Sequence, residues 1–176
     1  MKKLLFILFT FILFTSSIVV PPDQSEEANA KIKAIYIYNF TKYIEWPDSY
    51  HEGNFVIGFM GSNSALLNNL SEMSKTKKVG SQNIEIRNIS TVGDADKFHI
   101  IYILNDNSPQ LTEVLNKVKK KSTLIVTDKP GLAKQGSGIN FVIVENKQKI
   151  ELNKLNIEKY KLKVATTLVD MSLPIN

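Results

Sequence analysis

The sequence contains no cysteine among its 176 residues, and this absence excludes several kinds of chemistry. Without cysteine the chain forms no disulfide, has no thiol nucleophile and carries no lipid-modified cysteine. Small exported domains often need disulfides because their cores are too small, but residues 31–176 are long enough to bury a core of their own. A fold that depends on disulfides is therefore excluded.

Histidine is scarce, and the common catalytic motifs are missing. Only His51 and His99 occur, and neither has a second ligand at zincin or zinc-finger spacing. The sequence has no Gly-x-Ser-x-Gly turn, no Gly-x-x-x-x-Gly-Lys-Ser/Thr loop and no Gly-x-Gly-x-x-Gly fingerprint. We interpret His99, which lies in an apolar run, as a hydrogen-bonded core residue. These absences argue against an enzyme, and we expect no metal and no cofactor.

The N-terminus is typical of a secretory signal. Two lysines follow Met1, and an apolar run extends from Leu4 to Phe14, which is the order of parts in a signal peptide. Small residues suited to cleavage occur at 15–17 and at 28–30. We predict a signal peptide over residues 1–30, with cleavage after residue 17 as the alternative.

An uncleaved anchor is a second alternative for this segment. The mostly apolar stretch from Leu4 to Val20 approaches the ~17 residues that can span a bilayer. In both cases the two lysines stay in the cytoplasm and the rest of the chain is exported. The chain has a net charge of +5, but export argues against a nucleic-acid partner.

Short apolar runs and longer amphipathic segments alternate after residue 30. The runs predict strands at 55–60, 84–89, 98–104, 123–126, 139–144 and 150–152, and the amphipathic segments predict helices at 31–47, 66–73, 111–118 and 160–173. Such alternation predicts one α/β domain over residues 31–176, a three-layer sandwich flanked by helices. We expect a mainly parallel sheet of about five to six strands, partly mixed because its last two strands form a hairpin.

Segment 31–47 is ambiguous by itself and rich in aromatic residues. Ala34 to Tyr38 has strand-like content, whereas the spacing of the apolar residues also fits a helix, and the length favours a helix that Pro47 ends. Tyrosine and tryptophan are enriched at protein interfaces. We expect part of this aromatic stripe to be core and predict that Asn39, Lys42 and Trp46 face outward and bind a partner.

Polar residues follow three of the predicted strands and predict a ligand crevice. In an open parallel sheet, ligands bind outside the carboxyl ends of the strands, near the point where strand order reverses. The residues expected to line this crevice are Ser62, Asn63, Asn105, Asp106 and Asp128. Such a crevice suits a neutral or weakly anionic small molecule better than a magnesium ion. The alternative is that these side chains only cap helices and form turns.

Several strings match a known family. The segment from Lys33 to Pro47 (KAIYIYNFTKYIEWP) resembles the opening signature of the YfiR-like family of exported bacterial proteins. The strings at 55–58, 131–142 and 162–168 are similar to its first strand, its glycine-rich loop with the following strand, and its closing segment. The resemblance covers about residues 31–173 and implies that segment 31–47 is a helix.

The resemblance also implies a function. It implies a non-enzymatic periplasmic protein that binds and inhibits the extracytoplasmic sensor region of a membrane diguanylate cyclase or sensor kinase, and so controls cyclic di-GMP and biofilm formation. Characterised relatives carry disulfides and this chain has no cysteine, so redox control is not transferred. A periplasmic small-ligand binding protein that uses the crevice is the alternative function, and association into a homodimer stays open.

Overall fold

A mixed seven-stranded sheet forms the centre of the computed structural model, which describes residues 22–62, 64–95 and 98–175. The strand order is β3-β4-β2-β5-β6-β7-β8. The strands are β2 (Phe55–Met60), β3 (Lys78–Val79), β4 (Gln82–Asn88), β5 (Ile100–Ile103), β6 (Leu124–Thr127), β7 (Ile139–Val144) and β8 (Lys147–Leu152). The middle strands, from β4 to β7 in this order, are parallel, and the two edge strands are antiparallel.

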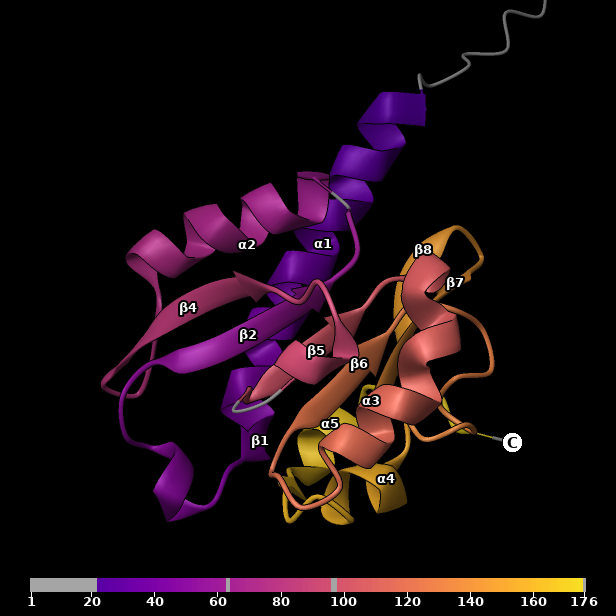
Figure 1. Cartoon of the computed structure of the whole chain (residues 1–176). Coiled ribbons are helices and arrows are strands. Elements are labelled where there is room, and N and C mark those ends of the chain that lie inside the picture. Colours follow the sequence, from indigo (N-terminus) through magenta and orange to yellow (C-terminus); the bar gives the residue numbers. More distant parts are fainter. Residues whose placement is uncertain (1–21, 63, 96–97, 176) are drawn as a thin grey trace, which may run out of the picture.

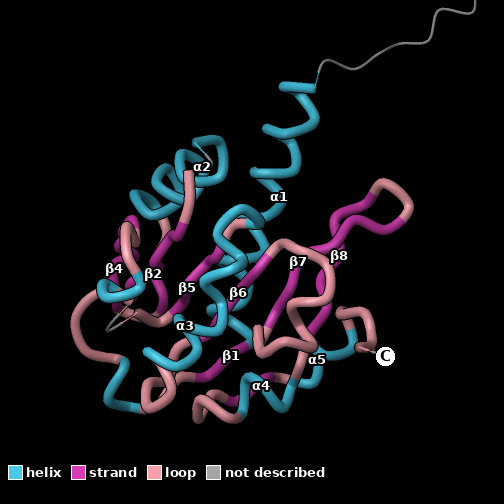
Figure 2. The backbone as a smooth tube through the Cα atoms, turned by 45° about the vertical axis from the view of Figure 1, so that its right-hand side comes forward, coloured by secondary structure: helices cyan, strands magenta, loops and turns pink. Residues whose placement is uncertain are grey.

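Helices cover both faces of this sheet (Figures 1 and 2). The long helix α1 crosses one face with α2 packed beside it, and α3 lies on the opposite face. The helices are α1 (Pro22–Tyr43), α2 (Ser64–Thr76), α3 (Leu111–Lys117), α4 (Lys154–Glu158) and α5 (Thr166–Asp170), with short 3₁₀ helices at Asp48–Tyr50, Val92–Asp94 and Asn105–Gln110. The predicted three-layer α/β sandwich with a mainly parallel, partly mixed sheet is confirmed.

Aromatic packing holds α1 on the sheet. Tyr36 and Phe40 of α1 lie 5.8 Å and 6.0 Å, between ring centroids, from Phe141 of β7. Phe59 of β2 stacks on Tyr102 of β5 at 5.4 Å. Each such pair contributes about 0.5–1.5 kcal/mol beyond the burial of its area. Segment 31–47 is thus mainly helical, as the resemblance implies, and much of its aromatic stripe is core.

The first helix begins earlier and ends earlier than expected. It starts at Pro22, inside the predicted signal segment, and Ala30 is only 3% exposed in the core. The boundary at residue 30 is still a prediction, and cleavage after residue 17 would leave α1 whole. In the described part of the chain, no helix is long and apolar enough to cross a membrane; the stretch from Leu4 to Val20 lies outside the described residues.

The expected helix at 160–173 forms only in part, because α5 covers Thr166–Asp170 and the residues before it are not helical. Lys161 adopts a left-handed backbone with φ of 60°, which interrupts any helix. The next residues form β9 (Lys163–Val164), which pairs antiparallel with β1 (Ile44–Glu45) in a separate two-stranded ribbon. Tyr160 and Leu162 are buried while Lys161 and Lys163 are exposed, which is the alternation of an extended segment. The sheet also gains β3, which is too short to show a periodic pattern.

His99 is the satisfied core residue that the sequence predicts. It is buried, and its ring stacks on Phe55 with a centroid distance of 4.3 Å. The backbone amide of Val56 donates to Nδ1 at 3.0 Å, and Nε2 lies 2.8 Å from the carbonyl oxygen of Tyr50. Because a carbonyl cannot donate, Nε2 carries the proton and the imidazole is neutral.

A glycine in the middle of β2 leads to a prediction about stability. A Cβ atom at Gly58 would lie 2.5 Å from Ile89 Cδ1 and 2.7 Å from Phe98 Cδ1. We expect Gly58→Ala to lower the free energy of unfolding by about 1–3 kcal/mol through overpacking, as measured by urea denaturation. Gly93→Ala is the control, since its nearest neighbour would be Thr91 Oγ1 at 3.3 Å. Equal stability of the two variants would contradict the packing argument.

A second prediction concerns pH. Burial lowers the pKa of His99, and the nearby His51 lowers it further, so the unfolded chain takes up a proton near pH 6.5 while the folded chain does not. Stability is therefore full above about pH 6.5 and falls below it, by up to about 1.4 kcal/mol per pH unit. Urea denaturation between pH 7.5 and 5.5, a window set by that unfolded value, should show this loss in the wild type and in His51→Gln. A loss of the same size in His99→Gln would refute the assignment.

Candidate functional site

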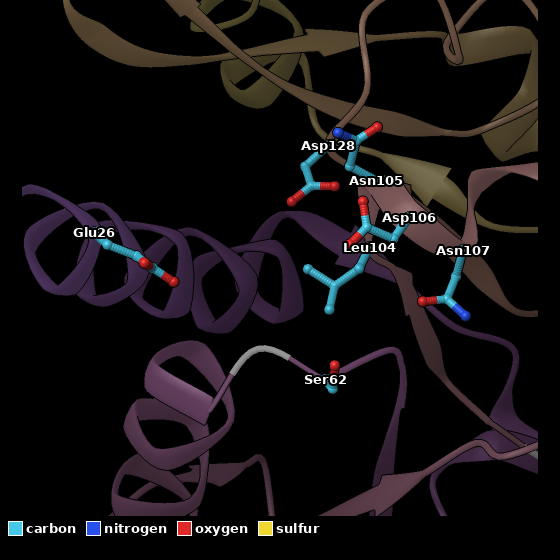
Figure 3. Close-up of a pocket in the computed structure, with 7 residues that line it drawn as sticks. All are labelled: Glu26, Ser62, Leu104, Asn105, Asp106, Asn107 and Asp128. Carbon is cyan, nitrogen blue, oxygen red and sulfur yellow. The ribbon is translucent and has the colours of Figure 1, made fainter. Parts of the chain in front are cut away.

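The strand order reverses between β2 and β5. The chain passes from β2 to β4 on one side and then crosses to β5 on the other side. The loops that follow β2 and β5 therefore diverge, which is where open α/β sheets bind ligands. A pocket of about 350 Å³ lies at this point (Figure 3), and its lining residues are Glu26, Ser62, Leu104, Asn105, Asp106, Asn107 and Asp128.

The structure brings most of the predicted crevice residues together. Ser62 follows β2, Asn105 and Asp106 follow β5, and Asp128 follows β6, and all four line this pocket. Asn63 lies outside the described residues. The location of the crevice thus agrees with the strand-end argument, and ligand binding itself stays a prediction.

Asp128 is held by two side chains from other elements. Lys33 Nζ of α1 lies 2.9 Å from Asp128 Oδ2, and the hydroxyl of Tyr102 on β5 donates to the same oxygen at 2.9 Å. We call Lys33, Tyr102 and Asp128 the Asp128 clamp. Burial raises the pKa of Tyr102 well above its usual value, and the negative charge of Asp128 raises it further. The hydroxyl therefore stays protonated and serves as a permanent donor.

The pocket lining is acidic. Three carboxylates, those of Glu26, Asp106 and Asp128, share it with polar Ser62 and two asparagines. The ammonium of Lys33 offsets the charge of Asp128, and Asp106 forms no ion pair with any described residue. The sequence leads us to expect a neutral or weakly anionic molecule. An anion would be repelled by this lining, so the weakly anionic alternative is disfavoured and a neutral molecule stays compatible.

The carboxylates do not form a metal site in the described ranges, where no group of three or more acidic, histidine or cysteine side chains could hold an ion. His99 does not line this pocket, and both of its ring nitrogens bond to the backbone of Tyr50 and Val56. The acidic pocket therefore offers hydrogen-bond acceptors and negative charge. It does not place an imidazole base beside Asp106 or Asp128.

Sequence reasoning missed three pocket residues and two clamp residues. Glu26 falls within the predicted signal segment, and Leu104 and Asn107 flank the predicted crevice residues. Lys33 and Tyr102 lie on α1 and β5 and reach Asp128 only in the folded chain. One signal was available: Tyr102 is a tyrosine in a buried aliphatic strand, where its hydroxyl needs a partner.

Gly61 sets the close approach of two pocket walls. It follows β2 with φ of 127°, a backbone that favours glycine. A Cβ atom here would overlap Leu104 and lie 2.8 Å from Asn107 Oδ1. Glycine thus lets the end of β2 pack against the loop that follows β5.

The expected outward surface on α1 is partly wrong. Lys42 is exposed, with Nζ 4.7 Å from the ring centroid of Tyr38, and Asn39 is half-buried. Trp46 is only 4% exposed and packs edge-on against Phe55 at 5.0 Å. The reason is that the helix ends at Tyr43, so residue 46 leaves the helical phase of its neighbours. Whether Asn39 and Lys42 bind a partner stays a prediction.

Two isoleucines extend this surface along the helix. Ile32 and Ile35 are 40% and 47% exposed. With Asn39 and Lys42 they follow a spacing of three, four and three residues, which places them on one side of α1. We call these four residues the α1 stripe.

Comparison with known proteins adds a family and a fold. The YfiR/HmsC-like family matches residues 30–172, and no curated protein matches the chain. Eight chains of solved structures match. One is the crystal structure of a conserved domain protein from Vibrio cholerae, with a TM-score of 0.52 and 11% identity; the match covers 84% of this chain and 60% of the other. At that identity the likeness shows the fold alone.

The clamp leads to a prediction about stability. Tyr102→Phe removes a hydrogen bond to a buried carboxylate, so we expect the free energy of unfolding to fall by about 1.5–3 kcal/mol. Tyr38→Phe is the matched control, because its hydroxyl makes only an exposed contact of 3.4 Å with the carbonyl of Lys78, and it should change stability by less than about 0.5 kcal/mol. Urea denaturation at pH 7 compares them. A Tyr102→Phe protein as stable as the control would contradict the clamp.

Proposed function

The chain belongs to the YfiR/HmsC-like family, and on this premise we propose that it is a non-enzymatic periplasmic regulator. It binds the extracytoplasmic sensor region of a membrane signalling protein and inhibits it. The partner class is a diguanylate cyclase, with a sensor kinase as the alternative. Inhibition of the cyclase lowers cyclic di-GMP and restrains biofilm formation.

The observation that carries this proposal is the extent of the family match. It runs from residue 30 to residue 172, and so includes most of α1, the whole sheet and the closing ribbon. A signal-like N-terminus supports export, because a charged start precedes an apolar run. The acidic pocket supplies no nucleophile paired with a base among the described residues, which supports a regulatory role over a catalytic one.

The α1 stripe is the surface that we propose for the partner. It joins two exposed isoleucines to Asn39 and the positive charge of Lys42. Apolar side chains grouped on one side of a helix are a frequent feature of interaction sites. The helix beneath the stripe is fixed to the sheet through Tyr36 and Phe40, so the surface is presented without a loss of order on binding.

The test combines a cellular readout with capture of the partner. Deletion of the gene should raise cyclic di-GMP, and the wild-type chain should restore the original level. Ile35→Glu should fail to restore it. A charged side chain at the centre of the α1 stripe should lower the affinity for the partner by roughly tenfold or more. Leu155→Glu is the control, since Leu155 is exposed on α4 outside the stripe.

Capture from membranes identifies the partner. Affinity-tagged wild-type chain and the Leu155→Glu control should each recover a membrane signalling protein, and Ile35→Glu should recover much less. Unchanged cyclic di-GMP on deletion, together with capture of no signalling protein, would sink the proposal. Equal capture by both variants would show that the α1 stripe is not the surface that binds the partner.

A further inference from the structure

One oxygen of the Asp128 clamp has no hydrogen-bond partner in the part of the chain that the structure describes. The side chain of Asp128 is only 8% exposed. Its Oδ2 accepts hydrogen bonds from Lys33 Nζ and from the hydroxyl of Tyr102. Among the described residues, no group donates a hydrogen bond to the buried Oδ1. A buried carboxylate oxygen without a donor costs free energy, so a site of this kind calls for an explanation.

The unpaired oxygen belongs to the pocket wall. Asp128 lines the pocket, and Figure 3 shows its carboxyl group directed toward the space bordered by Glu26, Leu104 and Ser62. Two donors from α1 and β5 fix the carboxylate through its other oxygen. Oδ1 is therefore an acceptor whose direction is set before any ligand arrives, which lowers the cost of binding.

The charges around this acceptor select a cation. The ammonium of Lys33 compensates Asp128, whereas Asp106 forms no ion pair with any described residue and adds negative charge to the lining. Glu26 is a third carboxylate in this lining. Charge-assisted hydrogen bonds from ammonium or guanidinium groups to carboxylates are stronger than neutral ones. A cavity of about 350 Å³ is at the small end of the range for ligand sites, about 300–1,000 Å³.

We propose that this pocket binds a small molecule bearing an ammonium or guanidinium group. Its N–H donates to Asp128 Oδ1, and the carboxylates of Asp106 and Glu26, which also line the pocket, stabilise its positive charge. Ser62, Asn105 and Asn107 supply neutral polar contacts to the remainder of the molecule. The proposal is independent of the regulatory function, which a failure to bind such a molecule would leave standing.

Isothermal titration calorimetry of the purified full chain tests the site. The probe is agmatine, which carries a guanidinium at one end and an ammonium at the other, and glutarate is the anionic control. Agmatine should bind and glutarate should not. Asp128→Asn should weaken agmatine binding by at least about tenfold, because it replaces a charged acceptor by an amide.

A second pair of variants keeps the test decisive if Asp128→Asn does not fold. Asp106→Asn removes an exposed carboxylate from the pocket and should weaken agmatine binding severalfold. Glu113→Gln removes an exposed carboxylate on α3, outside the lining, and should leave the affinity unchanged. No heat of binding at millimolar agmatine would overturn the proposal. Equal binding of glutarate, or equal affinity of Asp106→Asn and Glu113→Gln, would also overturn it.

Discussion

The Asp128 clamp is the interaction on which the arrangement of this molecule depends. Lys33 comes from α1, Tyr102 from β5, and Asp128 follows β6, so one carboxylate oxygen joins three elements that are far apart in the sequence. Lys33 Nζ also lies 5.8 Å from the ring centroid of Phe141 on β7. Because breaking a buried pair leaves an uncompensated charge, the clamp fixes where α1 crosses the sheet.

Two surfaces follow from the position of α1. Near its start, α1 contributes Glu26 to the acidic pocket, and farther along, it presents the α1 stripe. The pocket and the proposed partner surface thus share one rigid element. A ligand that favours one placement of α1 would change the affinity for a partner, and the partner would change the affinity for the ligand by the same factor.

The layers and the crevice were predictable because they depend on local patterns. Continuous apolar runs such as 55–60 are typical of strands covered on both faces, and parallel strands bring their polar ends to one edge. This is why the sequence alone suffices to group Ser62, Asn105, Asp106 and Asp128. The clamp was not predictable, because its lysine and tyrosine reach Asp128 across 95 and 26 residues of sequence.

The remaining differences between the sequence-based expectations and the structure have local causes that the spacing of apolar residues does not show. The helix expected at 160–173 is reduced to α5, because Lys161 takes a left-handed backbone and the next residues pair with Ile44 and Glu45. Trp46 is expected to face the solvent only if the helix continues to residue 46. Because α1 ends at Tyr43, the helical spacing no longer gives the direction of the Trp46 side chain. Glu26 was missed because a signal-like start and a folded helix share the same N-terminal segment, and composition alone does not mark the boundary.

The most direct test of the clamp is a double-mutant cycle in urea with Lys33→Met, Tyr102→Phe and the double variant. Both side chains hold Asp128 Oδ2, so once one is removed the carboxylate can protonate or rehydrate, and removing the second costs less. The double variant should therefore be more stable than the sum of the single losses predicts, with a coupling of at least about 0.5 kcal/mol. Losses that add within about 0.3 kcal/mol would contradict a shared clamp.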